Sequence, residues 1–333
     1  MNAGVMAEWF RRQGYRVIRT PSSYWVEASA RVYQAFPYHW LIEPSERELN
    51  DLLLKHNAIA LRYSAPLTAP QGKVSYHVVC EDPAYDLAIL PRQTRQNVRK
   101  GLEYATVEPI PLARLAEEGW RLRLDTLSRQ GRAAAESEAW WRRLCMSAVD
   151  LPGFEAWGAL HDGQLTASFL SFTCDDCFTL PHEQSASAHL EYRVNNAIFY
   201  SVIREALGRP GISGLFFCLQ SLDAPASVDE FKFRMGCTAK PVRQRVAFHP
   251  LLAPLIGKLG HAAARRLMER YPSQATPAKL EGMLRFHLEG KCAPSAQQWP
   301  ECLASREGEL QGLLEGNAPA DAVVLFDGTA ASM

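Results

Sequence analysis

FEAWGALHDGQLTASFLSFTCDDCFTLPHEQS, residues 154–185, decides the fold. Its apolar runs are separated by HDGQ and by CDDC, and an Asp-Gly pair between apolar runs is a strong hairpin signal. We therefore predict three antiparallel strands joined by two tight turns. The next stretch, VNNAIFYSVIREALGRPG at residues 194–211, repeats apolar residues at helical spacing. It predicts a helix that ends at Gly208 and Pro210.

This order of elements excludes one large class of fold. A doubly wound nucleotide-binding sheet alternates strands and helices, whereas here helices predicted at 112–130 and 136–149 precede a run of strands. The chain also has neither G-x-G-x-x-G after a strand nor a phosphate loop ending in Gly-Lys-Ser/Thr. We predict instead an α/β protein of the α+β kind, with a mixed, mostly antiparallel sheet flanked by helices.

Two more strands and a short helix follow. GLFFCLQS at 214–221 is an apolar run, and VRQRVAFHP at 242–250 alternates as a half-exposed strand does. Between them lies EFKFRMG at 230–236, which alone reads as another strand. Because Ser227 stands three residues before the glutamate of this stretch, a capping box predicts a helix start. We expect a short helix that stops at Gly236.

A helix with a row of arginines lies ahead of the strands. Pro91 begins it, and Val98, Leu102 and Ala105 share one apolar face. Beside that face lie Arg92, Arg95 and Arg99, with Lys100 nearby. Guanidinium groups bind phosphate bidentately, so the row suits the wall of a ligand cleft. The alternative is an ordinary solvated face paired with acidic residues.

The rest of the chain forms an N-terminal and a C-terminal part. The first contains the β-rich runs RVIRT, IALRYS and VSYHVVC and a helix at 45–56 that opens on a capping box. The second has an amphipathic helix at 251–271 and a loose tail at 316–333. We expect three parts, at residues 1–90, 91–250 and 251–333.

The composition limits the class of function. Lysine and arginine total 36, as do aspartate and glutamate, so no general attraction to nucleic acid or to an anionic membrane is expected. Glu8, Arg11 and Arg12 interrupt the apolar N-terminal run, which does not fit a secretory signal. No apolar run predicts a membrane-spanning helix, and eight scattered cysteines suit reduced thiols. We expect a cytoplasmic protein.

Three segments together resemble the Gcn5-related N-acetyltransferase (GNAT) superfamily, and within it the FemAB-like or BioF2-like acyltransferases. They are RQTRQNVRKGLE at 92–103, the three strands with their following helix, and DEFKFRMGCTAKPVRQRVAFHP at 229–250. The resemblance covers roughly residues 85–250. It implies a GNAT-like acyltransferase core at 91–250, with 1–90 as a reduced N-terminal half.

The chain departs from that family in two places. The usual CoA loop is not apparent before Asn195, and Cys218 and Gln220 stand where the family has Asp-x-Gly. The resemblance implies an activated donor, either acyl-CoA, an acyl carrier protein or an aminoacyl-tRNA, and no tightly bound cofactor. It also implies direct attack by a small amine acceptor. The neutral net charge favours a small donor over tRNA. The alternative is a degenerate fold that serves as a binding or scaffold module.

The helix start at Asn195 and Asn196 is a candidate donor site. Unpaired N–H groups and the helix dipole attract anions there, and the resemblance places the donor's pyrophosphate at the equivalent helix. The alternative is that the asparagines only cap a buried helix. Tyr192 and Tyr200 flank the same helix start. Either could protonate a leaving thiolate, or both pack against the helix.

His182 and Glu183 are candidate bases. Acyl transfer to an amine needs a group that takes up the proton, and the resembled superfamily often keeps one on its central strands. His182 titrates near neutrality, whereas the pKa of Glu183 would have to be raised by burial. The alternative is that one residue faces solvent and the other satisfies a buried backbone group.

Lys232 is the ligand-facing cation that the resemblance implies. It would reach the donor's phosphate or the developing oxyanion, while Arg234 of the same short helix points elsewhere. We expect Lys232→Met to abolish transfer and to spare stability.

Two further motifs have alternative interpretations. Cys174 and Cys177 are spaced as metal ligands often are, but a structural zinc ion needs four ligands. His161 and His182 would have to supply the other two, and the protein would then be a zinc-binding interaction domain. A redox C-x-x-C motif would lie at the start of a helix, whereas this one lies between two predicted strands. We therefore expect a structural turn and no metal. The helix at 251–271 carries Lys258, Arg265, Arg266 and Arg270 beside an apolar face. It either contacts a membrane surface or packs on the core.

Overall fold

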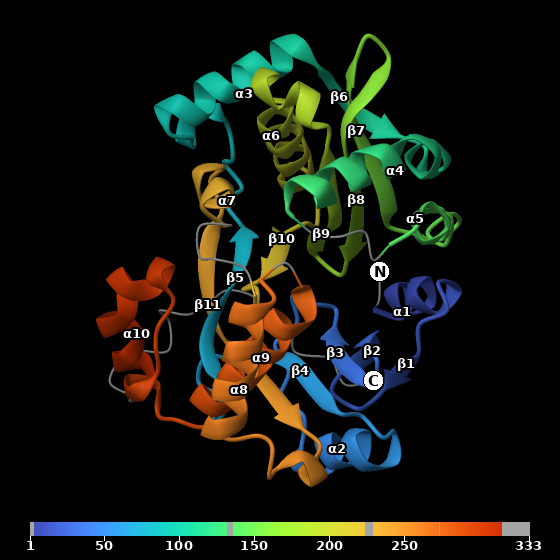
Figure 1. The fold of residues 1–333 in the computed structure, drawn as a ribbon. Coiled ribbons are helices and arrows are strands. Elements are labelled where there is room, and N and C mark those ends of the chain that lie inside the picture. The colour runs from blue at the N-terminus through green and yellow to red at the C-terminus, as the bar shows by residue number, and fades with distance from the viewer. Residues whose placement is uncertain (1–2, 132–135, 224–228, 273, 315–333) are drawn as a thin grey trace. The chain divides into compact units, whose positions relative to one another are not determined.

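The computed structural model describes residues 3–131, 136–223, 229–272 and 274–314 (Figure 1). The chain divides into two compact units that alternate along the sequence. Unit 1 comprises Met1–Gly14, Val78–Cys218 and Ser227–Thr238, and unit 2 comprises Tyr15–His77, Leu219–Ala226 and Ala239–Met333. The predicted boundaries at residues 90 and 250 separate parts by their relation to the resembled family as well as by compactness, so they stay a prediction.

The sheet of unit 1 contains the three predicted antiparallel strands. They are β7 (Phe154–His161), β8 (Gln164–Cys174) and β9 (Cys177–Ser185). A strand that the sequence did not predict, β6 (Thr106–Ile110), pairs with β7, and β10 (Gly214–Leu219) pairs with β9. The strand order is β10-β9-β8-β7-β6. All neighbours are antiparallel except β9 and β10, which are parallel.

The parallel strands β9 and β10 pair over only part of their length. Their register runs from Gly214↔Cys177 to Phe216↔Thr179. Beyond these pairs, β9 continues to Ser185 while remaining paired with β8, and β10 continues to Leu219. The two strands therefore separate toward their carboxyl ends.

Helices cover both faces of this sheet. On one face lies α6 (Val194–Leu207), whose Phe199 meets Phe169 of β8 at 4.8 Å between ring centroids. On the other lies α4 (Leu112–Arg129), whose Thr126 hydroxyl donates to the Ser185 carbonyl. The indole N–H groups of two tryptophans join α4, α5 (Glu138–Met146) and α1 (Ala3–Arg12): Trp141 donates to the Leu115 carbonyl and Trp9 to the Leu144 carbonyl.

The arginine-bearing helix α3 (Arg92–Tyr104) packs on the start of α6. Its buried residues are Thr94, Val98 and Gly101, whereas Leu102 is 39% exposed. The prediction that Leu102 shares the buried face is therefore wrong. The contact with α6 is centred on Gly101 and turns the helix so that Leu102 points outward.

Gly101 is required where α3 crosses α6. A Cβ atom at this position would lie 2.5 Å from the Arg193 carbonyl oxygen and 2.9 Å from the Ala197 Cβ. We expect Gly101→Ala to lower the free energy of unfolding by about 2 kcal/mol, because backbone atoms have little room to move away. Gly312→Ala is the matched control, since a Cβ there meets no atom within 4 Å. Equal urea unfolding midpoints for the two variants would contradict the close packing.

The sheet of unit 2 has the order β1-β2-β3-β4-β11-β5. The sequence predicted β1 (Val17–Arg19), β4 (Ala60–Ala65) and β5 (Lys73–Cys80), and the structure confirms them. It did not predict β2 (Tyr24–Ser29) or β3 (Val32–Phe36). Strands β3 and β4 are parallel, and the pairs β1–β2, β2–β3 and β4–β11 are antiparallel.

The last strand, β11 (Thr238–Phe248), is not half-exposed as predicted. It lies between β4 and β5 in the strand order, and residues of both its faces are buried. Arg243 is 3% exposed and donates to the carbonyls of Leu67 and Gly72. The alternating pattern predicted that the face carrying Arg243 is exposed, because arginine is charged. The guanidinium of Arg243 instead donates its hydrogen bonds to backbone oxygens inside unit 2.

Helices complete unit 2. The predicted capping box is confirmed in α2 (Glu46–Asn50), where the Ser45 side chain accepts from the Glu48 N–H, and the chain continues as a π-helical turn, η1 (Asp51–Lys55). The later helices are α8 (Lys258–Arg270), α9 (Ala275–Glu289) and α10 (Glu307–Leu314). Short 3-10 turns are η2 (Leu87–Ile89) and η3 (Ser187–Tyr192) in unit 1, and η5 (Pro250–Leu252), η6 (Pro294–Ala296) and η7 (Glu301–Arg306) in unit 2.

The tail predicted at 316–333 lies outside the described residues. Of the helices in the described part of the chain, none has the length and apolar character needed to cross a membrane.

Candidate functional site

The short helix predicted in EFKFRMG is present. It is α7 (Glu230–Arg234), which is followed by Met235 and by Gly236 at a φ of 88°. Ser227 of the predicted capping box lies outside the described residues, and the residue at the N-cap position is Asp229. Because Arg234 is exposed and the side chain of Lys232 is only 14% exposed, the two cations point in different directions, as predicted.

Lys232 is the centre of a small polar cluster. Its ammonium donates to Asp229 Oδ1 at 3.1 Å and to Cys218 Sγ at 3.0 Å. Burial by itself would lower the pKa of Lys232, but the Cys218 thiol and the carboxyl groups of Glu183 and Asp229 raise it above its ordinary value. Burial raises the pKa of Cys218 to about 11. At neutral pH this is therefore a charged lysine beside a neutral thiol.

Glu183 lies next to this cluster. It is opposite Phe169 in the β8–β9 register, so it shares the face of the sheet on which α6 packs. Burial raises the pKa of Glu183 to about 7; Lys232 opposes this rise and Asp229 adds to it. The carboxyl group is thus half ionised near neutrality, which is the property expected of a general base.

The cluster occupies the space where β9 and β10 separate. Glu183 lies past Thr179, and Cys218 lies past Phe216, the last residues of the parallel register. Strands that diverge leave the backbone groups between them without a partner in the ladder. The four polar side chains therefore converge on a break in the ladder of hydrogen bonds.

The start of α6 adjoins the same place. Asn196 Nδ2 lies 3.4 Å from Met235 Sδ, which connects the first turn of α6 to the end of α7. The prediction that Asn195 or Asn196 caps the helix is wrong, because the N-cap is Arg193, a left-handed residue with no capping side chain. The asparagines lie in the first turn, where N–H groups lack intrahelical acceptors.

No family model matches the chain, and no curated protein matches it. Three solved structures are similar to it over most of its length. The C-terminal domain of a protein assigned as a lysylphosphatidylglycerol synthetase from Agrobacterium fabrum has 13% sequence identity and a TM-score of 0.50, with 80% of this chain and 90% of that chain covered. FemX has 10% identity and a TM-score of 0.53, with 75% and 93% covered. A GCN5-related N-acetyltransferase from Kribbella flavida has 12% identity and a TM-score of 0.42, with 75% and 96% covered.

The chain therefore has the fold of the synthetase domain and of FemX. The predicted fold class is confirmed: a mixed sheet flanked by helices, of the α+β kind.

His182 lies on the other face of the sheet of unit 1 from Glu183, because successive strand residues alternate. The indole rings of Trp9, Trp140 and Trp141 surround it with centroids 6.4, 6.0 and 6.0 Å away. Burial, with a smaller effect of Arg123, lowers the pKa of His182 to about 3. This neutral imidazole does not join the Lys232 cluster, and its catalytic role stays a prediction.

The arginines of α3 remain free of partners among the described residues. Arg92 and Arg99 are exposed, Arg95 is half-buried, and none of the three side chains makes a hydrogen bond or ion pair with the described part of the chain. Their binding role stays a prediction, because no contact joins them to the Lys232 cluster. A partnerless row on the helix that packs on the start of α6 remains available for phosphate.

The tyrosines near α6 have packing partners. Tyr200 is buried with its ring 5.9 Å from that of Tyr85, and Tyr192 stacks on Tyr104 at 4.1 Å. No described contact connects either residue to Glu183 or Lys232.

The CDDC motif is the turn between β8 and β9. Cys174 and Cys177 face each other across the ends of these strands. His161 lies at the β7–β8 turn, at the opposite end of β8, and His182 lies far along β9. The two histidines therefore do not join the cysteines in a ligand set.

Two members of the cluster, Asp229 and Cys218, were not predicted. Asp229 precedes Lys232 by three residues, and side chains at this spacing on a helix lie close together. The sequence could therefore have predicted this ion pair. Cys218 stood out only as a departure from Asp-x-Gly. Its contact with Lys232 connects residues fourteen apart, and no local pattern carries that information.

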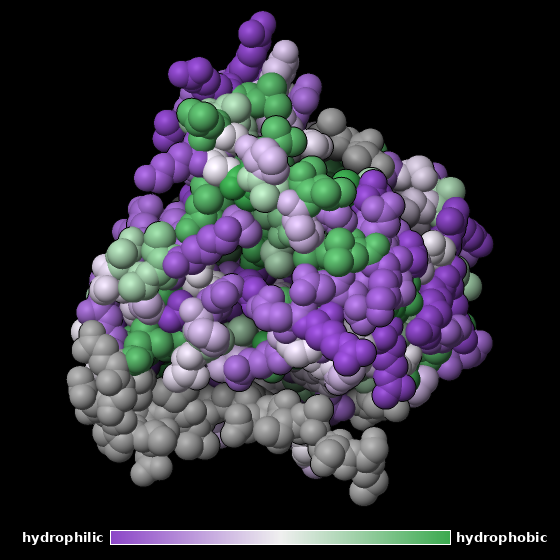
Figure 2. Space-filling model, turned by 90° about the horizontal axis from the view of Figure 1, so that it is seen from below, coloured by the Kyte–Doolittle hydropathy of each residue, from purple (hydrophilic) through white to green (hydrophobic). Residues whose placement is uncertain are grey.

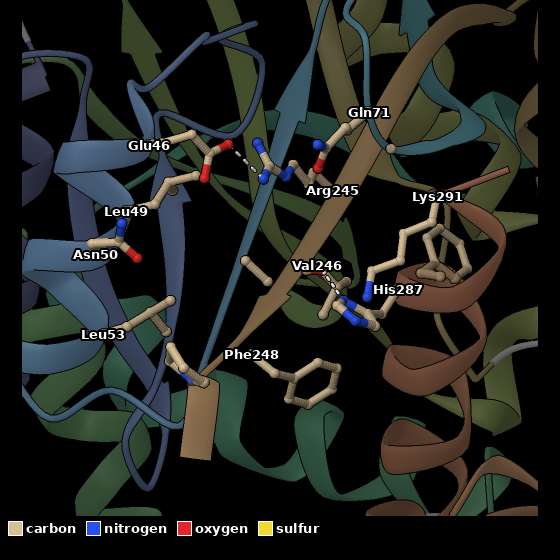
Figure 3. A pocket seen from close by; sticks show the side chains of 15 residues that line it. Glu46, Leu49, Asn50, Leu53, Gln71, Arg245, Val246, Phe248, His287 and Lys291 are labelled. Atoms are coloured by element: carbon tan, nitrogen blue, oxygen red, sulfur yellow. Dashed lines mark hydrogen bonds and ion pairs between the residues drawn. The ribbon is translucent and has the colours of Figure 1, made fainter. Parts of the chain in front are cut away.

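Unit 2 contains a cavity of about 180 Å³ between β11, α2 and α9 (Figure 3). Two of its basic groups are already engaged: Arg245 pairs with Glu46 at 2.8 Å, and His287 Nδ1 lies 2.8 Å from the Val246 carbonyl oxygen. The cavity therefore offers fewer polar side chains for binding a ligand than the cluster of unit 1, and we place the candidate site in unit 1.

Proposed function

We propose that the protein is an N-acyltransferase that moves an acyl or aminoacyl group from an activated donor to an amine. The observation that carries the proposal is the cluster of Lys232, Asp229, Cys218 and Glu183 in the gap between β9 and β10. It combines a fixed cation with a carboxyl group that titrates near neutrality. Acyl transfer needs one group of each kind.

The proposed reaction is a direct attack. The amine nitrogen forms a bond to the donor carbonyl carbon, and Glu183 accepts the proton that the amine loses. The bond from that carbon to sulfur, or to oxygen in an ester donor, then breaks, and the leaving group takes up the proton that Glu183 accepted, which restores the carboxylate. No bond to the enzyme forms. Catalysis comes from positioning the two substrates and from stabilising the oxyanion.

Lys232 is proposed to stabilise the negative charge of the reaction. An ammonium group has three N–H donors, and two of those of Lys232 go to Asp229 and Cys218. Since no other described residue takes the third, it remains for the carbonyl oxygen or a donor phosphate. Asp229 keeps the side chain oriented, so the cation needs little rearrangement when charge develops.

Acyl-CoA is the donor that we propose first, and aminoacyl-tRNA is the second candidate. The neutral net charge of 36 against 36 residues favours the smaller polyanion. The likeness to a protein assigned as a lysylphosphatidylglycerol synthetase keeps an aminoacyl group among the candidates. In both cases the free arginines of α3 and the first turn of α6 would contact donor phosphates.

Donor binding is the first measurement. We expect acetyl-CoA or a longer acyl-CoA to raise the melting temperature, and Arg95→Ala to weaken this binding about tenfold through loss of a phosphate contact. Arg31→Ala is a control at an arginine of unit 2 that already bonds to Asn57. Equal binding by the two variants would remove α3 from the donor site.

The second candidate function is a non-catalytic binding or scaffold module. The absent CoA loop and the Cys218 and Gln220 departures support it. Incubation with acyl-CoA and a panel of amino acids and polyamines, followed by mass spectrometry of acylated products, separates the two. Binding without any product from acyl-CoA or charged tRNA would favour the module, and no binding to any donor would refute the transferase.

A further inference from the structure

Three leucines at the beginning of the C-terminal helical segment of unit 2 are exposed to an unusual degree. Leu251 is 82% exposed, Leu255 is 68% exposed and Leu259 is 89% exposed. Single exposed leucines are common, but three within one short segment form an apolar patch. Pro250, Ala253 and Pro254 beside them are also exposed.

The orientation of α8 explains the exposure of Leu259, whereas Leu251 lies in η5 and Leu255 in the turn that precedes α8. Its inner face is fixed on α9, because Ala264 is 4% exposed and His261 Nε2 lies 2.8 Å from Glu281 Oε1 of α9. Leu259, Arg266 and Arg270 follow one another at spacings that share a helical face, and all three are exposed. The outer face of α8 therefore begins with a leucine and continues with arginines.

The same surface is strongly basic in a chain with no net charge. Between residues 250 and 270 there is one acidic residue, Glu269, which lies 4.0 Å from Arg265. The basic residues are Lys258, Arg265, Arg266 and Arg270. Figure 2 shows apolar side chains at the surface, with hydrophilic ones around them, on the face seen from below.

We propose that this surface docks on an anionic phospholipid bilayer. The basic leucine surface consists of Leu251, Leu255, Leu259, Lys258, Arg265, Arg266 and Arg270. Exposed leucines at the tip of an amphipathic helix enter the headgroup region, and the flanking cations contact lipid phosphates. Nucleic acid would use the cations but would give the leucines no apolar environment, so the pairing of both features favours lipid. The proposal does not depend on the transferase activity.

The test is co-sedimentation of the full chain with vesicles. We expect binding to vesicles that contain phosphatidylglycerol, little binding to phosphatidylcholine alone, and a fall in binding as salt is raised. Replacing Leu251, Leu255 and Leu259 together with serine should weaken binding at least about tenfold, since the inserted apolar area is lost. Because these side chains are exposed, the melting temperature should stay unchanged.

Leu54→Ser is the matched control. Leu54 is 57% exposed elsewhere in unit 2, so its replacement should leave vesicle binding as it is. The proposal is overturned if the wild-type chain does not sediment with phosphatidylglycerol vesicles, or if the triple variant binds as well as the wild type. It is also overturned if the chain forms a dimer that the triple variant disperses while neither form binds vesicles, because the leucines would then contact a second copy.

Discussion

Lys232→Met is expected to reduce transfer at least about 100-fold, because it removes a largely buried cation positioned where β9 and β10 separate. The structure changes the earlier expectation that stability would be spared. Asp229 is 7% exposed and its described ion pair is with Lys232. Breaking a buried ion pair by removing one partner costs about 3–5 kcal/mol. The single variant should therefore lose both activity and stability.

A second variant separates these two effects. Lys232→Met combined with Asp229→Asn also removes the negative charge that Lys232 balances, so most of the free energy of unfolding should return while transfer stays lost. Arg234→Met is the matched control on the same helix, since Arg234 is exposed. Transfer is measured by mass spectrometry of the acylated amine, and stability by urea unfolding. Recovery of activity in the double variant would show that Lys232 is only a partner for Asp229.

Glu183→Gln is expected to reduce transfer about 100-fold or more, because the amide cannot accept the proton of the attacking amine. The pH dependence gives a second signature. Burial raises the pKa of Glu183 to about 7, so the wild-type rate should rise with pH and level off above this value. The residual rate of the variant should lack this rise. A wild-type profile that is flat from pH 5 to 9 would contradict the role of Glu183 as the base.

The same substitution should stabilise the protein at high pH. The native chain keeps a proton on Glu183 between its ordinary pKa of 4.5 and about 7, whereas the unfolded chain has released it. Stability therefore falls as pH rises through this interval. Above pH 7, Glu183→Gln should be more stable than the wild type by roughly 3 kcal/mol, and below pH 4 the two should be equal. Glu191→Gln, at an exposed site, is the control.

The helices of the core and the antiparallel strands follow from local sequence. The Asp-Gly turn, the apolar stripe of residues 194–207 and Gly236 each act within a few neighbouring residues, so their effects could be read in order along the chain. Pairing between strands that are far apart in the sequence has no such local pattern. Strands β2 and β3 were not predicted, and β11 was predicted as half-exposed, because burial of Arg243 depends on carbonyls of a distant loop.

The candidate site divides in the same way. The sequence by itself determined that Lys232 and Arg234 point apart on a short helix, and that His182 and Glu183 face opposite sides of a strand. Only the tertiary structure decided which side carries the polar cluster of Lys232. It placed three tryptophans around His182 and brought Cys218 to Lys232. Periodicity fixes the direction of a side chain relative to its own element, but its pKa and partners depend on what the rest of the chain packs against it.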